Sequence, residues 1–239
     1  MRKAYFTPKT IAIYIIILSS MILLTSIGSK ATNVVSYHTS CANRTCIIID
    51  AGHGGVDGGA TSCTGALESA INLEIAIRLN DMLHLLGLKT QMIRTTDISV
   101  YTEGNTISQK KVSDLKERVR IVNQTENSLL VSIHQNYYSD ERYSGAQVFF
   151  APDNSSRELG RQLQSALVSH LNPGSRRQSK KADGIYLLRK INKPGILVEC
   201  GFLSNPEEEA KLRNREYQLS LSCVIATSCS NYLSVNAVS

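Results

Sequence analysis

The residues best suited to chemistry in this sequence are two histidines and two glutamates: His53, Glu68, His134 and Glu199. His134 and Glu199 directly follow short apolar runs, and His53 lies in a glycine-rich segment that follows a third one. Two imidazoles and a carboxylate can hold one Zn²⁺ and leave a fourth position for water, whose pKa the ion lowers to about 7. A second carboxylate can take a proton from that water and return it to a leaving amine. These residue types therefore predict a catalytic zinc site.

The glycine-rich segment around His53 has two possible uses, metal binding and phosphate binding. Five glycines lie within positions 52–59. Because glycine tolerates positive φ and lets the backbone approach a ligand closely, such a loop favours a binding site over a structural role. The segment lacks the GK[ST] ending of a P-loop, and after Gly52 and Gly54 it lacks the third glycine of the dinucleotide fingerprint. We therefore expect it to present His53 to a metal.

The assignment of the carboxylates leaves alternatives open. Glu74 and Asp57 compete with Glu68 for the place of the third ligand. For Glu199 the structural alternative is a salt-bridged carboxylate. An ionised glutamate at the end of the apolar run 195–198 is costly without a cation nearby, which favours a place beside the metal.

Short apolar runs alternate with amphipathic segments from Cys46 onward, which predicts a single α/β domain with a largely parallel, mixed central sheet flanked by helices. The carboxyl ends of parallel strands meet at one edge, so His53, His134 and Glu199 can converge there. We expect helices at 69–86, from about 113, at 156–171, and from 205 to 233 with a break near 214. We expect strands at 47–49, 90–94, 129–133, 146–151, 184–188 and 195–199.

The first part of the chain predicts membrane targeting. Basic residues precede an apolar run at 11–27, a pattern typical of a signal anchor or a signal peptide that directs the following chain outward. We therefore divide the 239 residues into a membrane segment at 1–28, a polar tether at 29–45 and a catalytic domain at 46–235. The basic residues before the run are Arg2, Lys3 and Lys9.

The distribution of charge excludes a nucleic-acid-binding protein. The net charge is +6, but five of the 26 basic residues and none of the 20 acidic ones lie in residues 1–49. The remainder is close to neutral, whereas a nucleic-acid face needs concentrated positive charge. Six cysteines have no zinc-finger spacing, and their pairing cannot be deduced from the sequence.

Four blocks of this sequence together resemble the zinc-dependent N-acetylmuramoyl-L-alanine amidases. They occur in order over residues 46–233, and their combination is specific, although each block alone is weak. The blocks are DAGHGGVDGGA at 50–60, E-x-x-x-N-L at 68–73, S-I-H-Q-N at 132–136 and V-E-C-G-F-L-S-N-P at 198–206.

The resemblance implies an activity and assigns the site residues. It implies a zinc-peptidase-like fold and cleavage of the amide that joins the lactyl group of N-acetylmuramic acid to L-alanine in peptidoglycan. Carried over by position, His53, Glu68 and His134 are the ligands of one Zn²⁺, which settles Glu68 over its rivals. Glu199 becomes the general base and acid.

A narrower likeness is to the germination-specific amidases of spore-forming bacteria, on the motifs at 115–119, 144–147 and 184–188 and a short N-terminal anchor. These enzymes strip peptides from spore-cortex muramic acid, so that a separate deacetylase step can lead to muramic δ-lactam. The basic residues and apolar run of the N-terminus predict an exported protein, anchored in the membrane through residues 11–27, with its catalytic domain on the wall or cortex side.

Substrate contacts and partners are further expectations. We expect Asn136 to bond the substrate or orient His134, and Arg94, Arg118 and Arg189 to bind carboxylates of the acidic stem peptide. Many amidases need an activator or partner protein, and we expect such a partner here. The alternatives are a zinc carboxypeptidase acting on wall peptides and a non-catalytic, membrane-anchored adaptor with an amidase fold.

Overall fold

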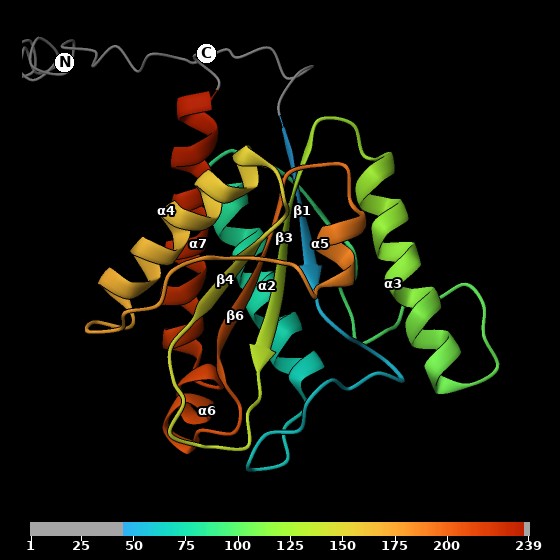
Figure 1. Ribbon diagram of the computed structural model, residues 1–239, viewed down its shortest axis with the longest axis horizontal. Helices are drawn as coiled ribbons and strands as arrows, with labels where there is room; N and C mark the ends of the chain where they lie inside the picture. Colours follow the sequence, from blue (N-terminus) through green and yellow to red (C-terminus); the bar gives the residue numbers. More distant parts are fainter. Residues whose placement is uncertain (1–44, 237–239) are drawn as a thin grey trace, which may run out of the picture. The chain divides into compact units, whose positions relative to one another are not determined.

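The computed structural model describes residues 45–236, which form one α/β domain (Figure 1). Its centre is a six-stranded sheet in the order β2-β1-β3-β6-β4-β5. The strands are β1 (Cys46–Ala51), β2 (Lys89–Met92), β3 (Ser128–Asn136), β4 (Gln147–Phe150), β5 (Lys180–Lys181) and β6 (Gly195–Phe202). Strand β4 runs antiparallel to β6, whereas the other neighbours are parallel. The predicted mixed, largely parallel sheet is therefore confirmed.

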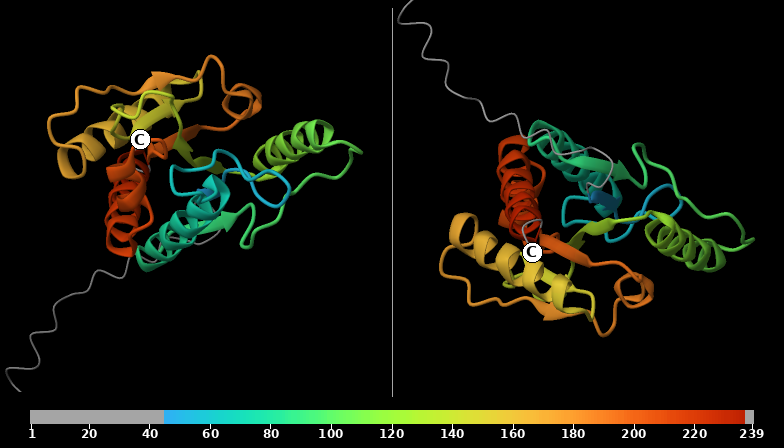
Figure 2. Two further views of the ribbon diagram at one scale, coloured as in Figure 1. Left: turned by 90° about the horizontal axis from the view of Figure 1, so that it is seen from below. Right: turned by 90° about the horizontal axis from the view of Figure 1, so that it is seen from above.

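Helices cover both faces of the sheet, α2, α4 and α7 on one and α3 and α5 on the other (Figure 2). Alternate residues of β1 enter opposite cores: Ile47 and Ile49 pack towards α2, and Ile48 packs towards α3 and α5. The apolar runs are uniform because both faces of these strands are buried. The helices are α2 (Glu68–Leu85), α3 (Ile107–Gln124), α4 (Asn154–His170), α5 (Tyr186–Lys190), α6 (Pro206–Leu212) and α7 (Arg215–Asn236).

Two expected elements need correction. The predicted strand at 184–188 is wrong, because residues 186–190 form α5 and place both Leu187 and Leu188 in the core. A short apolar run does not distinguish a strand from one turn of buried helix. Helix α3 begins at Ile107 rather than near 113, because Thr106 and Gln109 form a capping box ahead of the apolar stripe.

The predicted break in the last helical region is confirmed at Asn214. The side chain of Asn205 accepts hydrogen bonds from the first turn of α6, with Pro206 at its first position. Asn214 then accepts bonds from the backbone N–H groups of Glu216 and Tyr217 and so begins α7.

The predicted membrane segment at 1–28 and the tether lie outside the described residues, except for residue 45. Within residues 45–236, no helix is both long enough and apolar enough to cross a membrane.

Candidate metal centre

The loop after β1 brings His53 to the carboxyl edge of the sheet. His53 has a positive φ of 61°, and the two glycines that follow it also have positive φ. A Cβ atom at Gly52 would lie 2.2 Å from Nε2 of His134, and one at Gly59 would lie 2.6 Å from Oε2 of Glu68. These two glycines are therefore required by the close approach of the backbone to the site.

Strand register places the other two predicted residues side by side. His134 of β3 is the register partner of Glu199 of β6, and a bulge follows between His134 and Asn136. Bulges re-aim side chains at the ends of strands and are frequent next to functional sites. The convergence of His53, His134 and Glu199 at one edge is what the parallel sheet predicts.

His53, Glu68 and His134 form one compact cluster. Their potential ligand atoms all lie within 4.8 Å of one another. Nδ1 of His134 is 3.0 Å from Oε1 of Glu68, and Nε2 of His53 is 3.3 Å from Oε2 of the same carboxylate. The structure thus brings together the three residues that the sequence resemblance assigns as ligands.

Glu68 is held in place from three sides. It is the first residue of α2 and is 3% exposed. Its carboxylate accepts hydrogen bonds from the backbone N–H groups of Ala60 and Gln135 and from the side-chain amide of Asn72. The amide of Gln135 in turn donates to Asn72, so the carboxylate has a fixed orientation.

Asp57 and Glu74, the rivals of Glu68, have other partners. Asp57 lies 2.8 Å from Nδ1 of His53 and 2.7 Å from Nζ of Lys111, so it orients the imidazole from behind. Such a carboxylate partner fixes the tautomer of a metal-binding histidine. Glu74 instead accepts a hydrogen bond from Gln218.

The cluster has strongly perturbed protonation. Burial opposes the charged form of His53, but Glu68 and Asp57 outweigh it and raise its pKa to about 9. Burial also opposes ionisation of Glu68, yet the hydrogen bonds and charges of His134 and His53 keep its pKa well below the ordinary value. The ionised carboxylate and the two imidazoles on either side of it together form a suitable set of ligands for a cation.

Glu199 differs from Glu68 in having an unpaired oxygen. Its Oε2 atom is buried and makes no hydrogen bond within the described part of the chain. Burial is the main cause that raises the pKa of Glu199, and the charge of Glu68 acts in the same direction. A buried, unpaired carboxyl group beside two histidines is poised for proton transfer.

This set of residues fits a catalytic zinc ion. Two imidazoles and one carboxylate are a recurrent three-ligand set for catalytic zinc, and they leave a coordination position open. Within the described residues, Oε2 of Glu199 has no hydrogen-bond partner, and Glu199 is the register partner of His134. The fit rests on the chemistry of the donors and on that unpaired buried atom.

A cavity of about 410 Å³ opens beside the cluster. His53 and His134 form one wall, and the segment that leads into α5 forms another. Its size is within the range of small-molecule sites. Further lining residues include Lys111, Leu115, Ile185, Tyr186 and Leu197.

Two of the expected substrate-binding arginines are structural instead. Arg94 and Arg118 are each 2% exposed. Arg94 donates to the carbonyls of Ala51, Gly52, Ser69 and Thr96. This expectation is therefore corrected, because neither guanidinium is free to bind a peptide.

Arg118 holds the base of the glycine-rich loop. It forms ion pairs with Asp50 and Asp114 and donates to the backbone carbonyls of Ala51 and His53. This network thus fixes the chain on both sides of Gly52. The sequence feature that indicates this network is the i, i+4 spacing of Asp114 and Arg118, which places both side chains on one face of a helix.

The other two expected contacts lie in accessible positions. Asn136 is half-buried at the end of β3, and Arg189 is exposed on α5. Their roles stay predictions. Sequence reasoning missed Asn72 and Gln135 as supports of Glu68, although Asn72 lies at i+4 from Glu68 on the same helical face.

Comparison with known proteins agrees with this geometry. Residues 47–231 match the model of the family described as N-acetylmuramoyl-L-alanine amidase. The chain belongs to this amidase family. The match covers all of the elements that position the metal cluster, from β1 to α7.

Relatives within the family include a germination-specific amidase. The Germination-specific N-acetylmuramoyl-L-alanine amidase of Bacillus subtilis is 38% identical over 174 residues, which are 72% of this chain and 73% of that protein. The structure of the CwlD amidase from Clostridioides difficile in complex with the GerS lipoprotein has 37% sequence identity and a TM-score of 0.77. It covers 80% of this chain and 100% of that one.

A second solved amidase supports the same fold. The N-acetylmuramoyl-L-alanine amidase from Clostridium difficile 630 is 31% identical, with a TM-score of 0.71. The match covers 81% of this chain and 98% of that one. The single α/β amidase domain predicted from the sequence is thereby confirmed.

Proposed function

We propose that this amidase uses one zinc ion to hydrolyse the amide bond between the lactyl group of N-acetylmuramic acid and L-alanine in peptidoglycan. The observation that carries the proposal is the cluster of His53, Glu68 and His134 beside the buried, unpaired carboxyl group of Glu199. Family membership supports the bond that is cleaved.

His53, Glu68 and His134 are the proposed ligands. When bound, zinc supplies Lewis acidity that activates a water molecule and polarises the scissile carbonyl. Asp57 holds the imidazole of His53, and the bonds from Asn72 and Gln135 hold the carboxylate of Glu68. The chain therefore fixes the donors before the substrate arrives, which lowers the cost of assembling the site.

Glu199 is the proposed general base and acid. It takes a proton from the attacking water as the new carbon–oxygen bond forms at the lactyl carbonyl. It then gives that proton to the alanine nitrogen as the carbon–nitrogen bond breaks, leaving a lactyl carboxylate and a free amine. Its raised pKa makes the Glu199 carboxylate a stronger base towards the attacking water than an ordinary glutamate.

Substrate contacts come from the rim of the site. We propose that the amide of Asn136 donates a hydrogen bond to the substrate, since it follows His134 by two residues at the end of β3. We also propose that Arg189, whose side chain is exposed on α5, binds a carboxylate of the stem peptide.

We propose spore-cortex peptidoglycan as the substrate and a step towards muramic δ-lactam as the role. The germination-specific relative and the structural likeness to CwlD support this choice. A peptidoglycan deacetylase would act on the stripped muramic acid. Because the CwlD structure contains the GerS lipoprotein, we propose that this chain also acts with a partner protein.

We propose export to the outer side of the membrane, with residues 1–28 as the targeting segment, 29–45 as the tether and 46–235 as the catalytic domain. The basic residues and apolar run of the N-terminus support this arrangement. We expect the catalytic domain to be protected from added protease in intact cells. It should become accessible to the protease after the wall and outer layers are removed.

Two variants of the full-length protein test the site. Glu199→Gln is expected to keep bound zinc and to lose at least about a hundredfold in kcat, the lower range for general acid–base catalysis. His134→Ala is expected to lose both zinc and activity. Metal content by atomic emission and release of stem peptides are the two measurements. An active Glu199→Gln enzyme would remove Glu199 from the reaction, and normal zinc content in His134→Ala would remove that ligand.

A further inference from the structure

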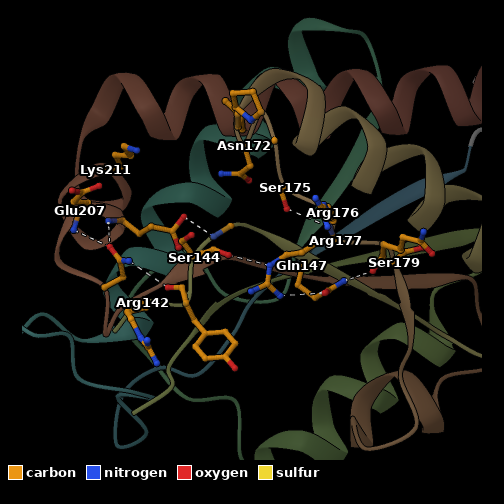
Figure 3. A pocket seen from close by; sticks show the side chains of 18 of the residues that line it. Arg142, Ser144, Gln147, Asn172, Ser175, Arg176, Arg177, Ser179, Glu207 and Lys211 are labelled. Carbon is orange, nitrogen blue, oxygen red and sulfur yellow. Dashed lines mark hydrogen bonds between the residues drawn. The ribbon is translucent and has the colours of Figure 1, made fainter. Parts of the chain in front are cut away.

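A second cavity, of about 1230 Å³, lies at the edge of the sheet beside β4 (Figure 3). It is lined by the segments 142–147 and 171–180 and by residues of α6. Five basic residues line it, against two acidic ones, Glu207 and Glu208. The basic residues of this basic cavity are Arg142, Arg176, Arg177, Lys180 and Lys211.

Much of the positive charge in the basic cavity is not neutralised. Arg142 forms an ion pair with Asp140. Within the described part of the chain, the other four basic side chains that line the cavity have no ion pair. The buried carboxylate of Glu208 is occupied, because it accepts hydrogen bonds from the backbone N–H groups of Gly145 and Phe202. The cavity therefore has an excess of available cationic groups.

Arg177 is held in a fixed orientation within this cavity. Its Nε atom donates to the carbonyl of Ser144 at 3.0 Å, and Nη1 donates to Oε1 of Gln147 at 3.4 Å. The guanidinium lies 5.1 Å from the ring centroid of Phe202, a cation–π distance. Figure 3 shows Arg177 joined to Gln147 in the wall of the cavity. Its Nη2 atom makes no hydrogen bond within residues 45–236, which leaves a donor for a ligand.

Gln147 supports Arg177 and connects the cavity to the metal centre. Its Nε2 atom donates to the carbonyl of Gln178 at 2.7 Å and to Oε1 of Gln164 at 3.1 Å. In the sheet, Gln147 is the register partner of Glu199. Phe202, against which Arg177 packs, follows Glu199 by three residues on β6. The basic cavity and the catalytic carboxyl group are thus on neighbouring strands.

We infer that the basic cavity is a subsite for the carboxylates of the acidic stem peptide, an inference that rests on the proposed function. Its volume exceeds the roughly 300–1,000 Å³ of drug-sized sites, as suits a peptide of several residues. Arginine presents paired donors that match a carboxylate, and the amide and hydroxyl groups of the lining can bond a peptide backbone. The cavity is open but recessed between two chain segments and α6, a shape that suits an extended peptide better than a flat lipid surface.

The test compares two substrates that differ only in the charge of the peptide. They are disaccharide-tetrapeptides with the second-residue carboxylate either free or amidated. The full-length double variant Arg176→Met/Lys180→Met is expected to raise KM for the free acid about tenfold, as for the loss of a hydrogen bond to a charged group. KM for the amidated substrate and kcat for both should change less than about twofold. Arg177→Lys keeps the charge but loses the paired N–H donors of the guanidinium, so it should also raise KM for the free acid.

Arg120→Met is the matched control, because Arg120 is exposed on α3 and, among the described residues, its side chain pairs with Glu117 and Gln124 alone. Equal changes of KM for the two substrates, or no change, would overturn the inference while leaving the amidase proposal intact. If the unaltered protein cleaves neither substrate, the proposed function itself fails. Vesicles of phosphatidylglycerol and of phosphatidylcholine provide a further arm. If the double variant loses binding to the anionic vesicles alone while its KM values for both substrates stay unchanged, the cavity binds lipid phosphate and the inference is overturned.

Discussion

Replacement of Arg118 by methionine is expected to destabilise the fold more than any surface change on the same helix. Arg118 is 2% exposed and forms ion pairs with Asp50 and Asp114, whose side chains are 1% and 12% exposed. Removal of one partner from a buried ion pair leaves an uncompensated charge and costs about 3–5 kcal/mol. The carbonyls of Ala51 and His53 also lose their donor. We therefore expect a loss of about 4 kcal/mol, a large part of the roughly 5–15 kcal/mol that stabilises a typical domain.

Urea unfolding at pH 7 measures this change, with Arg120→Met as the control. Arg120 is two residues further along α3 and pairs with Glu117 at the surface, so its replacement should leave the midpoint almost unchanged. The double variant Asp50→Asn/Arg118→Met should recover part of the loss, because the orphaned charge is removed with its partner. If Arg118→Met unfolds at the same urea concentration as Arg120→Met, the buried network does not hold the loop as described.

Three further results are expected. Gly52→Ala should lower zinc content and activity together, because its Cβ would lie 2.2 Å from Nε2 of His134; unchanged zinc content by atomic emission would contradict this packing argument. Burial opposes ionisation of Asp50, but the charge of the adjacent guanidinium outweighs it and lowers the pKa. The resulting stability is complete above the ordinary carboxyl pKa near 4 and is lost as pH falls through the lowered pKa, so Asp50→Asn should flatten the pH dependence of urea midpoints below pH 4. Among the cysteines of the described residues, thiol labelling of the native protein, mapped by mass spectrometry, should modify the exposed Cys63 and Cys223 first. Rapid native labelling of the buried thiols would contradict the packing, since burial raises the pKa of Cys229 to about 12 and also raises those of Cys46 and Cys200.

His134 and Glu199 could be predicted because each occupies a position that the sheet topology determines. Both lie in the carboxyl-terminal halves of buried parallel strands, so the sheet brings them together as register partners. The choice of Glu68 over Asp57 and Glu74 needed the family resemblance. The structure shows why: Asp57 contacts the outer nitrogen of His53, and sequence spacing alone does not distinguish that role from ligation.

The fate of the arginines could not be predicted in the same way. Arg94, Arg118 and Arg189 look alike in sequence, but two are buried and donate to carbonyls and carboxylates beneath the loop, whereas Arg189 is exposed. Burial of a charged side chain depends on partners that are distant along the chain, such as Asp50 for Arg118. The strand predicted at 184–188 is wrong for a related reason, because adjacent apolar residues suit both a strand and a short buried helix.

The identity of the cleaved bond tests the central claim most directly. Purified peptidoglycan treated with the full-length protein, with zinc and with a chelator, would be analysed by mass spectrometry. The account predicts zinc-dependent release of stem peptides that begin with a free L-alanine amino group, with the glycan strands intact. Cleavage at a peptide C-terminus, cleavage between sugars, or release that persists unchanged in the chelator would contradict it.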